Sequence, residues 1–308
     1  MAVMKKIRSR QEQIILRFRK NKLALFGLIG FLVIVLLAIG VPIFSPYDIS
    51  MPNLPQRFQP PSLAHPFGTD ALGMDMFTKT FAGLRITLVV GILATLIAVV
   101  IGIIYGSISG YIAGKTDEFM MALVDILYGL PFIAFVILMV FVFRDYGRLF
   151  FAGSSGFFSS SNLYLWEIWI MTLAMGSISW LTIARIVRGE VMGLRNLEFV
   201  EAAYALGCSH KRILFIHILP NILGPVIVYA TLTAPNVMLF ESFISFLGLG
   251  IQPPHPSLGR IISDDALARI AATHLNWWLF FFPGLVLAFS LFCLNILGDG
   301  LRDALDVK

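Results

Sequence analysis

Long hydrophobic blocks separated by short polar stretches dominate the pattern of this chain. Six blocks carry few or no charged residues, at 23–44, 86–112, 119–143, 163–184, 213–240 and 275–298. A bilayer core requires about 20 apolar residues of helix, and every block meets that length. The pattern therefore predicts an all-α membrane protein with six transmembrane helices.

Composition agrees with this interpretation. Hydrophobic residues make up 58% of the 308-residue chain and charged residues 13%, against about 45–50% and about 25% in soluble domains. With a mean hydropathy of +0.85, the chain has too little polar surface to coat a water-soluble globule. Disulfide scaffolds, collagen-like chains and disordered chains are excluded as well, and Cys208 and Cys293 are expected to be small buried residues.

The distribution of Lys and Arg predicts the orientation. Sixteen of the 23 basic residues fall on the side of the N-terminus, the 185–212 loop and the C-terminus, and seven fall on the other side. Because cytoplasmic loops carry the excess of positive charge, both termini are expected in the cytoplasm. The basic arm at 1–22 then meets anionic lipid, and nucleic acid is not needed to explain it. The first span, at 23–44, exceeds a signal-peptide core and is expected to be retained.

The external segments are short. Six of the fifteen prolines lie between Pro46 and Pro66, which predicts an extended surface segment there. This segment lies in a Pro-rich extracytoplasmic loop expected at 45–84. A second, Gly/Ser/Phe-rich loop is expected at 150–162. Neither is long enough for an independent catalytic domain, so residues 85–308 form the core domain with five spans.

Four glycines at every fourth position mark one face of the second span, and they predict close helix packing: Gly102, Gly106, Gly110 and Gly114. The segment 110–116 approaches a phosphate-binding loop, but only three residues separate its glycines and no strand precedes it. Nucleotide binding by this chain is therefore rejected. The five histidines are scattered, and no nucleophile or metal motif occurs, so no catalytic, cofactor or metal residue is expected.

Asp125 is the most costly residue within a predicted span. An ionisable side chain there normally faces the protein interior or an aqueous path. Asp125 lies six residues before Pro131, whose missing N–H should weaken or kink the helix. Two roles remain open, one lining a translocation path and one hydrogen bonding to a neighbouring helix. Glu167 and Glu241 are expected near the outer interface.

The polar stretch at 185–212 is the richest in local signals. Residues 198–206 have helical composition, Gly207 suits a helix stop, and Ser209 can cap a following helix. Its turn also fits a DNA-binding helix-turn-helix. That alternative fails because the second helix continues through Phe215 and Ile216 into a span, leaving few polar groups for base edges.

Glu201-Ala-Ala-Tyr-Ala-Leu-Gly207, followed after nine residues by His217-Ile-Leu-Pro220, resembles the coupling signature of the permease subunits of ATP-binding-cassette importers of the type I kind. His217 departs from the hydrophobic residue expected at its position. His65-Pro-Phe-Gly-Thr-Asp70 with Leu72-Gly-Met-Asp75 resembles the C subunit of oligopeptide and dipeptide permeases, although that family usually has Arg at Met74. The segments 241–254 and 297–306 resemble the same subunit, and the oligopeptide branch fits best.

The resemblance implies a function and a set of partners. It implies import of oligopeptides across the bacterial cytoplasmic (inner) membrane, beside a second homologous permease, two cytoplasmic ATP-binding subunits and an extracytoplasmic peptide-binding protein. ATP and Mg²⁺ would be bound by the ATPase subunits. It assigns ATPase coupling to Glu201, Ala202, Ala203, Gly207, Ser209 and Pro220.

Within the family, import of dipeptides, nickel or antimicrobial peptides stays open. A secondary transporter is the alternative outside it. Such a protein would need paired intramembrane charges or broken helices in matching halves, and Asp125 has no counterpart in the second half.

Overall fold

The computed structural model describes residues 10–49, 51–152, 160–252, 257–263 and 276–305. Their helices are α1 (Arg10–Lys20), α2 (Lys22–Phe44), α3 (Met76–Ile112), α4 (Gly114–Tyr128), α5 (Phe132–Ala152), α6 (Ser160–Arg195), α7 (Glu198–Ala205), α8 (His210–Arg212), α9 (Leu219–Phe246), α10 (Leu258–Ile261) and α12 (Trp278–Leu305). A 3₁₀ turn covers Leu54–Gln56, and a π-helical segment, Ile213–Ile218, joins α8 to α9.

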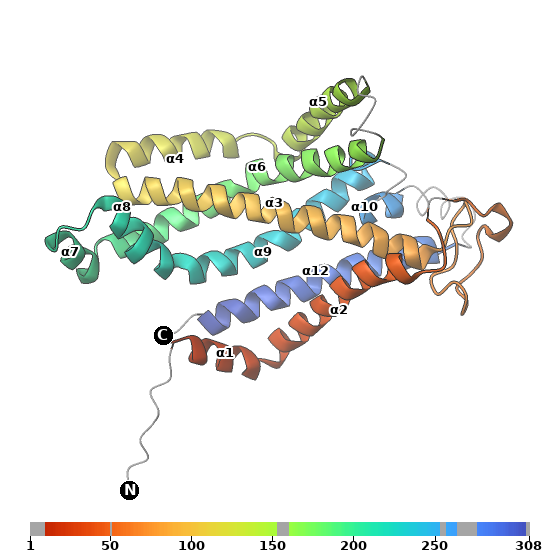
Figure 1. Ribbon diagram of the computed structural model, residues 1–308, viewed down its shortest axis with the longest axis horizontal. Helices are drawn as coiled ribbons and strands as arrows, with labels where there is room; N and C mark the ends of the chain where they lie inside the picture. The colour runs from red at the N-terminus through yellow and green to blue at the C-terminus, as the bar shows by residue number, and fades with distance from the viewer. Residues whose placement is uncertain (1–9, 50, 153–159, 253–256, 264–275, 306–308) are drawn as a thin grey trace, which may run out of the picture.

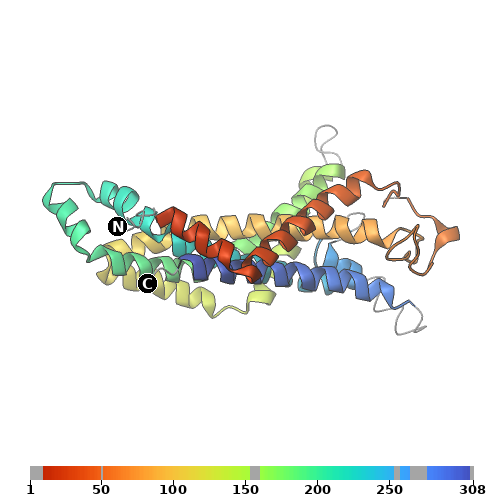
Figure 2. The same ribbon diagram turned by 90° about the horizontal axis from the view of Figure 1, so that it is seen from below.

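The long helices run side by side along an elongated bundle (Figures 1 and 2). Helices α7 and α8 lie at one tip, called here the α7 end, and residues 45–75 lie at the other, called the loop end. Helix α1 and the last turns of α12 pack together toward the α7 end, where Asn21 Nδ2 donates to Asp303 Oδ2 at 3.5 Å. The described chain therefore begins and ends on the same side of the bundle as α7.

The described residues hold five helices that are long and apolar enough to cross a membrane, and a sixth crossing if the bent pair α4 and α5 is one span. This pair is bent by 81°. The break falls at Pro131, where the sequence predicts a weakened or kinked helix within the 119–143 block. Helix α4 ends where the Gly129 and Leu130 N–H groups bond back to Asp125, Ile126 and Leu127. Pro131 has no N–H to continue the ladder, and its ring disfavours helix at the residue before it.

Several helices extend beyond the hydrophobic blocks. Helix α3 begins at Met76 rather than 86, because Asp75 caps it by accepting from Thr78 N at 2.8 Å. Helix α6 continues to Arg195, so residues 185–195 of the predicted coupling segment are the end of the fourth span. Hydropathy marks the thickness of the bilayer, whereas caps and turns decide where a helix ends.

Helices α3 and α6 make the most extensive contact of the bundle. A Cβ added at Gly102, Gly106 or Gly110 would lie 2.4–2.6 Å from the nearest atom of α6. The small residues therefore let the two backbones approach, as the four-residue spacing predicts. The prediction of close helix packing is wrong for Gly114. This residue has open space around it and a φ of +63° in the turn between α3 and α4.

The loop end is more ordered than an extended surface segment. His65 Nδ1 and Asp75 Oδ1 lie 2.9 Å apart, both side chains are buried, and Lys79 donates to Asp70 Oδ2 at 2.7 Å. Asp70 Oδ1 also accepts from the Met74 backbone N–H. These bonds fold residues 65–75 onto the start of α3, directly after the 46–66 segment that is predicted to be extended.

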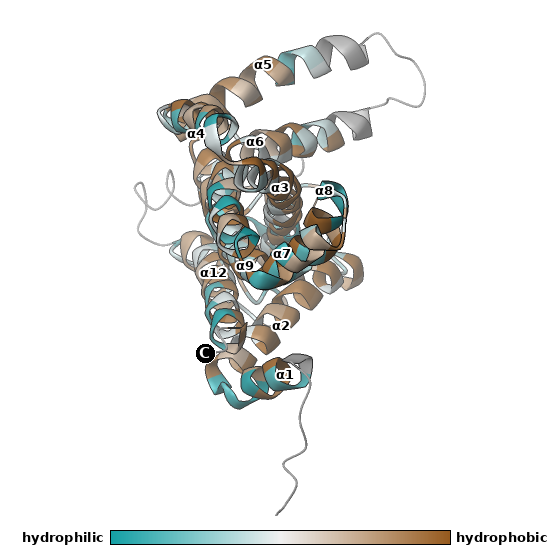
Figure 3. Ribbon diagram, turned by 90° about the vertical axis from the view of Figure 1, so that its left-hand side faces the viewer, coloured by the Kyte–Doolittle hydropathy of each residue, from teal (hydrophilic) through white to brown (hydrophobic). Residues whose placement is uncertain are grey.

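The outer surface of the bundle carries the apolar residues that a bilayer or another subunit would cover. Leu36 and Phe44 of α2 are 69% and 85% exposed. Seen from the α7 end, α2 is largely hydrophobic whereas α1 is mostly hydrophilic (Figure 3). The basic, surface-lying α1 thus ends where the first span begins, at Asn21, which caps α2.

Candidate functional site

Two places in the structure bring functional candidates together, the α7 end and a pocket beside the broken third span. Helix α7 follows α6 after a break at residues 196–197 and is closed by Gly207. Gly207 has a φ of +77°, its N–H bonds to Tyr204 O, and the Cys208 N–H bonds to Ala203 O. This paired bonding is a Schellman motif, which requires a left-handed residue after the helix. The predicted helix and its glycine stop are confirmed.

The two faces of α7 differ in exposure. Val200 and Ala203 are buried against the bundle, packed in one cluster with Val191 and Ile213. The face away from the bundle carries the exposed residues Glu201, Ala202 and Leu206, and Leu206 is 84% exposed. The burial of Ala203 therefore changes the prediction that both alanines contact an ATPase subunit. Ala203 keeps α7 close to its own bundle, and only Ala202 of the two alanines faces outward.

A hydrogen-bonded cluster connects α7 and α8 to the end of α3. Tyr111 Oη lies 2.6 Å from Tyr204 Oη and 2.9 Å from His210 Nδ1. Arg195, the last residue of α6, donates from Nη1 to Tyr111 O at 3.0 Å. Ser209 caps α8 by accepting from Arg212 N at 3.4 Å. These side-chain bonds therefore connect α7 and α8 to the ends of α3 and α6.

Pro220 lies in the first turn of α9, directly after the π-helical segment. A proline can occupy that position because the first N–H groups of a helix lack intrahelical acceptors. His217, the departure from the coupling signature, is half-buried inside the π-helical segment, and its carbonyl accepts from Asn221 Nδ2 at 2.7 Å. The segment that joins α8 to the fifth span is therefore a locally altered helix, a feature that often accompanies functional positions.

Two ion pairs attach α4 to α6. The Arg188 guanidinium makes two hydrogen bonds to the Asp117 carboxylate, which also accepts from Ser109 Oγ. Arg185 Nη2 donates to Asp125 Oδ1, and its Cζ lies 4.0 Å from the centroid of the Tyr128 ring. Asp125 therefore bonds to a neighbouring helix, which was one of its two expected roles. Its side chain remains 66% exposed.

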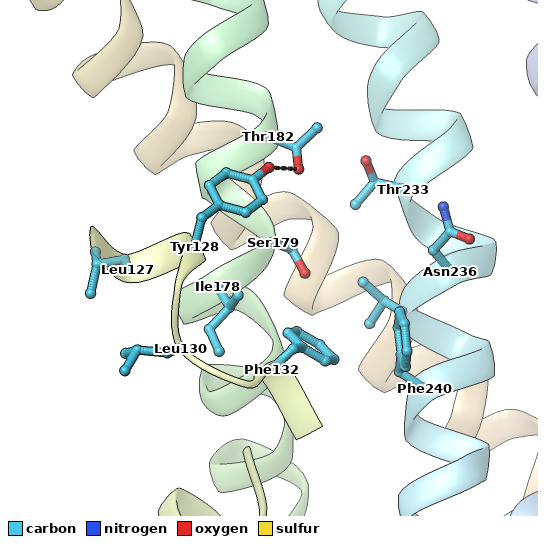
Figure 4. A pocket seen from close by; sticks show the side chains of 11 residues that line it. Leu127, Tyr128, Leu130, Phe132, Ile178, Ser179, Thr182, Thr233, Asn236 and Phe240 are labelled. Carbon is cyan, nitrogen blue, oxygen red and sulfur yellow. Dashed lines mark hydrogen bonds between the residues drawn. The ribbon is translucent and has the colours of Figure 1, made fainter. Parts of the chain in front are cut away.

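A cavity of about 470 Å³ lies at the break of the third span, between α4, α5, α6 and α9 (Figure 4). This volume is within the range of about 300–1,000 Å³ that holds small ligands. The lining residues are Leu127, Tyr128, Leu130, Phe132, Ile178, Ser179, Thr182, Thr233, Asn236, Val237 and Phe240. Asp125 is not among them. Sequence reasoning missed this pocket, although polar pairs three residues apart at 179/182 and 233/236 were a visible signal.

At the loop end, two acids anchor the segment after α9. Arg144 Nε lies 3.3 Å from Glu167 Oε1, and Glu167 Oε2 accepts from the Gln252 backbone N–H at 2.9 Å. Glu241 is fully buried and accepts from Thr87 Oγ1 and Ser245 Oγ, each at 2.8 Å. Glu241 thus ties α9 to α3 inside the protein.

Comparison with known protein families identifies the group. Residues 99–308 match the family described as binding-protein-dependent transport system inner membrane component, and residues 9–61 match the N-terminal TM domain of oligopeptide transport permease C. The chain belongs to the first of these families, as an oligopeptide-permease-C type permease of the ABC transporters. This permease is a multi-pass inner-membrane component.

Curated relatives match nearly the whole permease. The oligopeptide transport system permease protein OppC of Bacillus subtilis (strain 168) is 42% identical over 99% of this chain and 92% of its own length. OppC of Escherichia coli (strain K12) is 43% identical over 95% and 89%. The dipeptide transport system permease protein DppC of Bacillus subtilis (strain 168) is 41% identical over 95% and 84%.

A solved structure shares the fold. A chain of the MetNI methionine ABC transporter, in an inward-facing conformation, superposes with a TM-score of 0.50 at 20% identity. The match covers 72% of this permease and 94% of that chain. The expected all-α fold of the ABC importer kind is therefore confirmed.

Proposed function

We propose that this permease is one of two transmembrane subunits of an ATP-driven importer that carries oligopeptides across the cytoplasmic membrane. Two ATP-binding subunits would bind ATP and Mg²⁺ and hydrolyse the nucleotide, and an extracytoplasmic binding protein would deliver the peptide. Residues 110–116, which approach a phosphate-binding loop in sequence, form the end of α3 and the start of α4, and Gly110 is packed against α6. This arrangement supports nucleotide binding by other subunits. The similarity to relatives named oligopeptide permeases supports the substrate class.

The observation that carries the coupling role is the outward face of α7. An exposed leucine at the tip of a polar segment, beside exposed alanine and glutamate, favours a partner protein that covers it. Val200 and Ala203 fix the opposite face to the bundle. The cluster around Tyr111 then links the helix to α3. We infer that α7 inserts into a groove of an ATPase subunit and transmits its closure to the spans.

The orientation follows from the same proposal. An ATPase subunit is cytoplasmic, so the α7 end would face the cytoplasm. The charge asymmetry along the sequence favours the same side. Since α1 and the end of α12 lie toward the α7 end, both termini would be cytoplasmic, and the loop end would meet the binding protein.

Dipeptide import is the second candidate. A dipeptide permease shares 41% identity with this chain, almost as much as the oligopeptide permeases do. The family match favours either peptide importer over a secondary transporter. Uptake of dipeptides and tetrapeptides by the assembled complex, delivered on the binding protein, separates these two candidates directly.

The test of coupling uses two substitutions with different physical effects. Gly207→Val places a β-branched residue at a φ of +77°, a left-handed conformation that costs about 1–2 kcal/mol for a residue with a Cβ. Ala202→Trp adds bulk to the exposed face of α7. Both variants should reach the membrane, yet peptide-stimulated ATP hydrolysis should fall to the basal rate, and Ala202→Trp should also co-purify less ATPase.

Two matched controls isolate the docking role. Gly207→Asn keeps a residue that tolerates left-handed geometry and should retain stimulation. Ala203→Trp overfills the permease's own packing and should lower its thermal stability instead. If Gly207→Val and Ala202→Trp keep wild-type stoichiometry and stimulation, α7 does not dock the ATPase.

A further inference from the structure

Most hydrogen-bond donors on the polar side chains of the pocket at the broken span are already bonded within the protein. Ser179 Oγ donates to Met175 O at 2.8 Å, and Thr233 Oγ1 donates to Tyr229 O at 2.7 Å. Asn236 Nδ2 donates to Leu232 O at 3.1 Å. Each of these bonds returns to the residue four positions earlier in its own helix, a common arrangement for polar residues in helices.

The groups that remain are therefore mainly acceptors. A hydroxyl oxygen that has donated its proton still accepts through its lone pairs, and the amide oxygen of Asn236 has no partner within the described residues. Tyr128 Oη and Thr182 Oγ1 are bonded to each other, which leaves one hydroxyl proton between them. Against five oxygen acceptors, the lining thus offers one N–H of Asn236 and that single hydroxyl proton.

Aromatic rings and the absence of a nearby net charge complete the site. Phe132 and Phe240 line the cavity with their ring centroids 4.7 Å apart. None of the described lining residues is ionisable apart from the Tyr128 phenol. The Arg185 guanidinium lies over the ring of Tyr128 and is paired with the Asp125 carboxylate. Apart from the Asn236 N–H and the one hydroxyl proton, a ligand therefore meets acceptor oxygens and aromatic faces on the described lining side chains (Figure 4).

We propose that this pocket binds the protonated amino terminus of the peptide in transit, a deepening that rests on the proposed function. An α-ammonium carries three N–H donors and no acceptor, which complements an acceptor-rich lining. Its charge is also attracted to aromatic faces. A peptide carboxylate needs several donors and would find only two here. Every unblocked peptide has an α-ammonium. A site that recognises this group does not recognise peptide side chains, so it suits peptides of varied sequence.

The sign of an introduced charge tests this assignment. Trialanine, whose only charges are its termini, is delivered on the binding protein to the complete complex in proteoliposomes, and ATP-dependent uptake is measured. Asn236→Asp should keep uptake within about twofold of the wild type, because a carboxylate still accepts from the ammonium. Asn236→Lys should lower uptake by about tenfold or more, because it places a like charge in the site. Lys is also longer than Asp, so Asn236→Met, which is uncharged and similar in length to Lys, is the size control, and the further loss from Met to Lys reports the charge.

An isosteric pair serves if either charged variant fails to assemble. Ser179→Ala with Thr233→Val removes two acceptor oxygens without adding charge, and uptake should fall by about threefold to tenfold, the weight of one or two hydrogen bonds. Thr231→Val is the matched control. Thr231 Oγ1 makes the same kind of bond, to Val228 O, but does not line the pocket, so uptake should not change.

Different uptake results would contradict the ammonium assignment and the proposed function. Equal loss with Asp and Lys, or loss with Asp alone, overturns the ammonium assignment, and loss with Asp alone points to the carboxylate end of the peptide. Wild-type uptake from the isosteric pair overturns it as well. A wild-type complex that shows no ATP-dependent uptake of any peptide contradicts the proposed function instead.

Discussion

Replacing Gly106 with valine should separate α3 from α6 and destabilise the bundle. A Cβ at this position would lie 2.4 Å from Ala184 O and 2.9 Å from Val187 Cβ, whereas ordinary contact begins at 3.4 Å. The oxygen belongs to the α6 backbone and cannot rotate away, so the helices must move apart by about 1 Å to restore normal contact. Overpacking of this kind costs about 1–3 kcal/mol.

The position of this clash in the core fixes what should be measured. Gly106 follows Tyr105, whose ring packs edge-on against Trp180 at 4.8 Å, so separation of the helices also changes a tryptophan environment. Domains of 150–250 residues lose about 2–4 °C of Tm per kcal/mol. Gly106→Val should therefore lower the apparent Tm of the detergent-solubilised complex by roughly 5 °C, followed by tryptophan fluorescence during heating.

Gly189→Val is the matched control for this prediction. Gly189 lies in α6 near the same contact, but nothing lies within 4 Å of a Cβ built there. Its substitution should shift the Tm by no more than about 1–2 °C, since an exposed helical glycine is itself a poor helix former. Equal Tm values for the two variants would refute the claim that the glycine stripe sets the approach of α3 and α6.

Three further predictions follow from the ion pairs and the orientation. In a Cys208→Ala, Cys293→Ala background, a membrane-impermeant thiol reagent applied to intact cells should label Leu63→Cys, which is fully exposed, and miss Ser209→Cys; the reverse labelling overturns the orientation. Asp117→Ala leaves Arg188, a third exposed, without its carboxylate and should cost about 1–3 kcal/mol, measured as a lower Tm that Asp117→Glu partly restores. Asp125→Leu should lower peptide uptake more than it lowers assembly with the partner chains, because Arg185 loses its counter-charge; full uptake would leave Asp125 only a packing role.

Local features of this protein could be predicted from its sequence because their causes are local. Uninterrupted apolar blocks must be helical in lipid, where every backbone N–H and C=O needs a partner within the segment. That requirement is enough to predict the spans. Gly207 ends α7 because the left-handed conformation there depends on the backbone of one residue. The weakening of the third span before Pro131 likewise follows from the covalent structure of proline.

Features that depend on distant residues were decided only by the tertiary structure. Ala202 and Ala203 are identical in type, and only the packing of α7 against Val191 and Ile213 determines that Ala203 is the buried one. Gly114 continues the four-residue spacing, yet the chain turns there and leaves the α3–α6 contact. The 81° bend could not be read from Pro131 alone, because α4 is attached to α6 by ion pairs.

The pocket is the clearest case of this difference. Its lining comes from the end of α4, the start of α5 and the middle of α6 and α9, which span more than a hundred positions of the chain. Each polar residue taken alone is an ordinary serine, threonine or asparagine in a helix, bonded to its own backbone. The sequence determines which side-chain donors are bonded within their own helix, because the acceptor carbonyl lies four residues earlier. Only helix packing brings the remaining oxygens to one cavity, because that juxtaposition depends on close contacts between segments far apart in the chain.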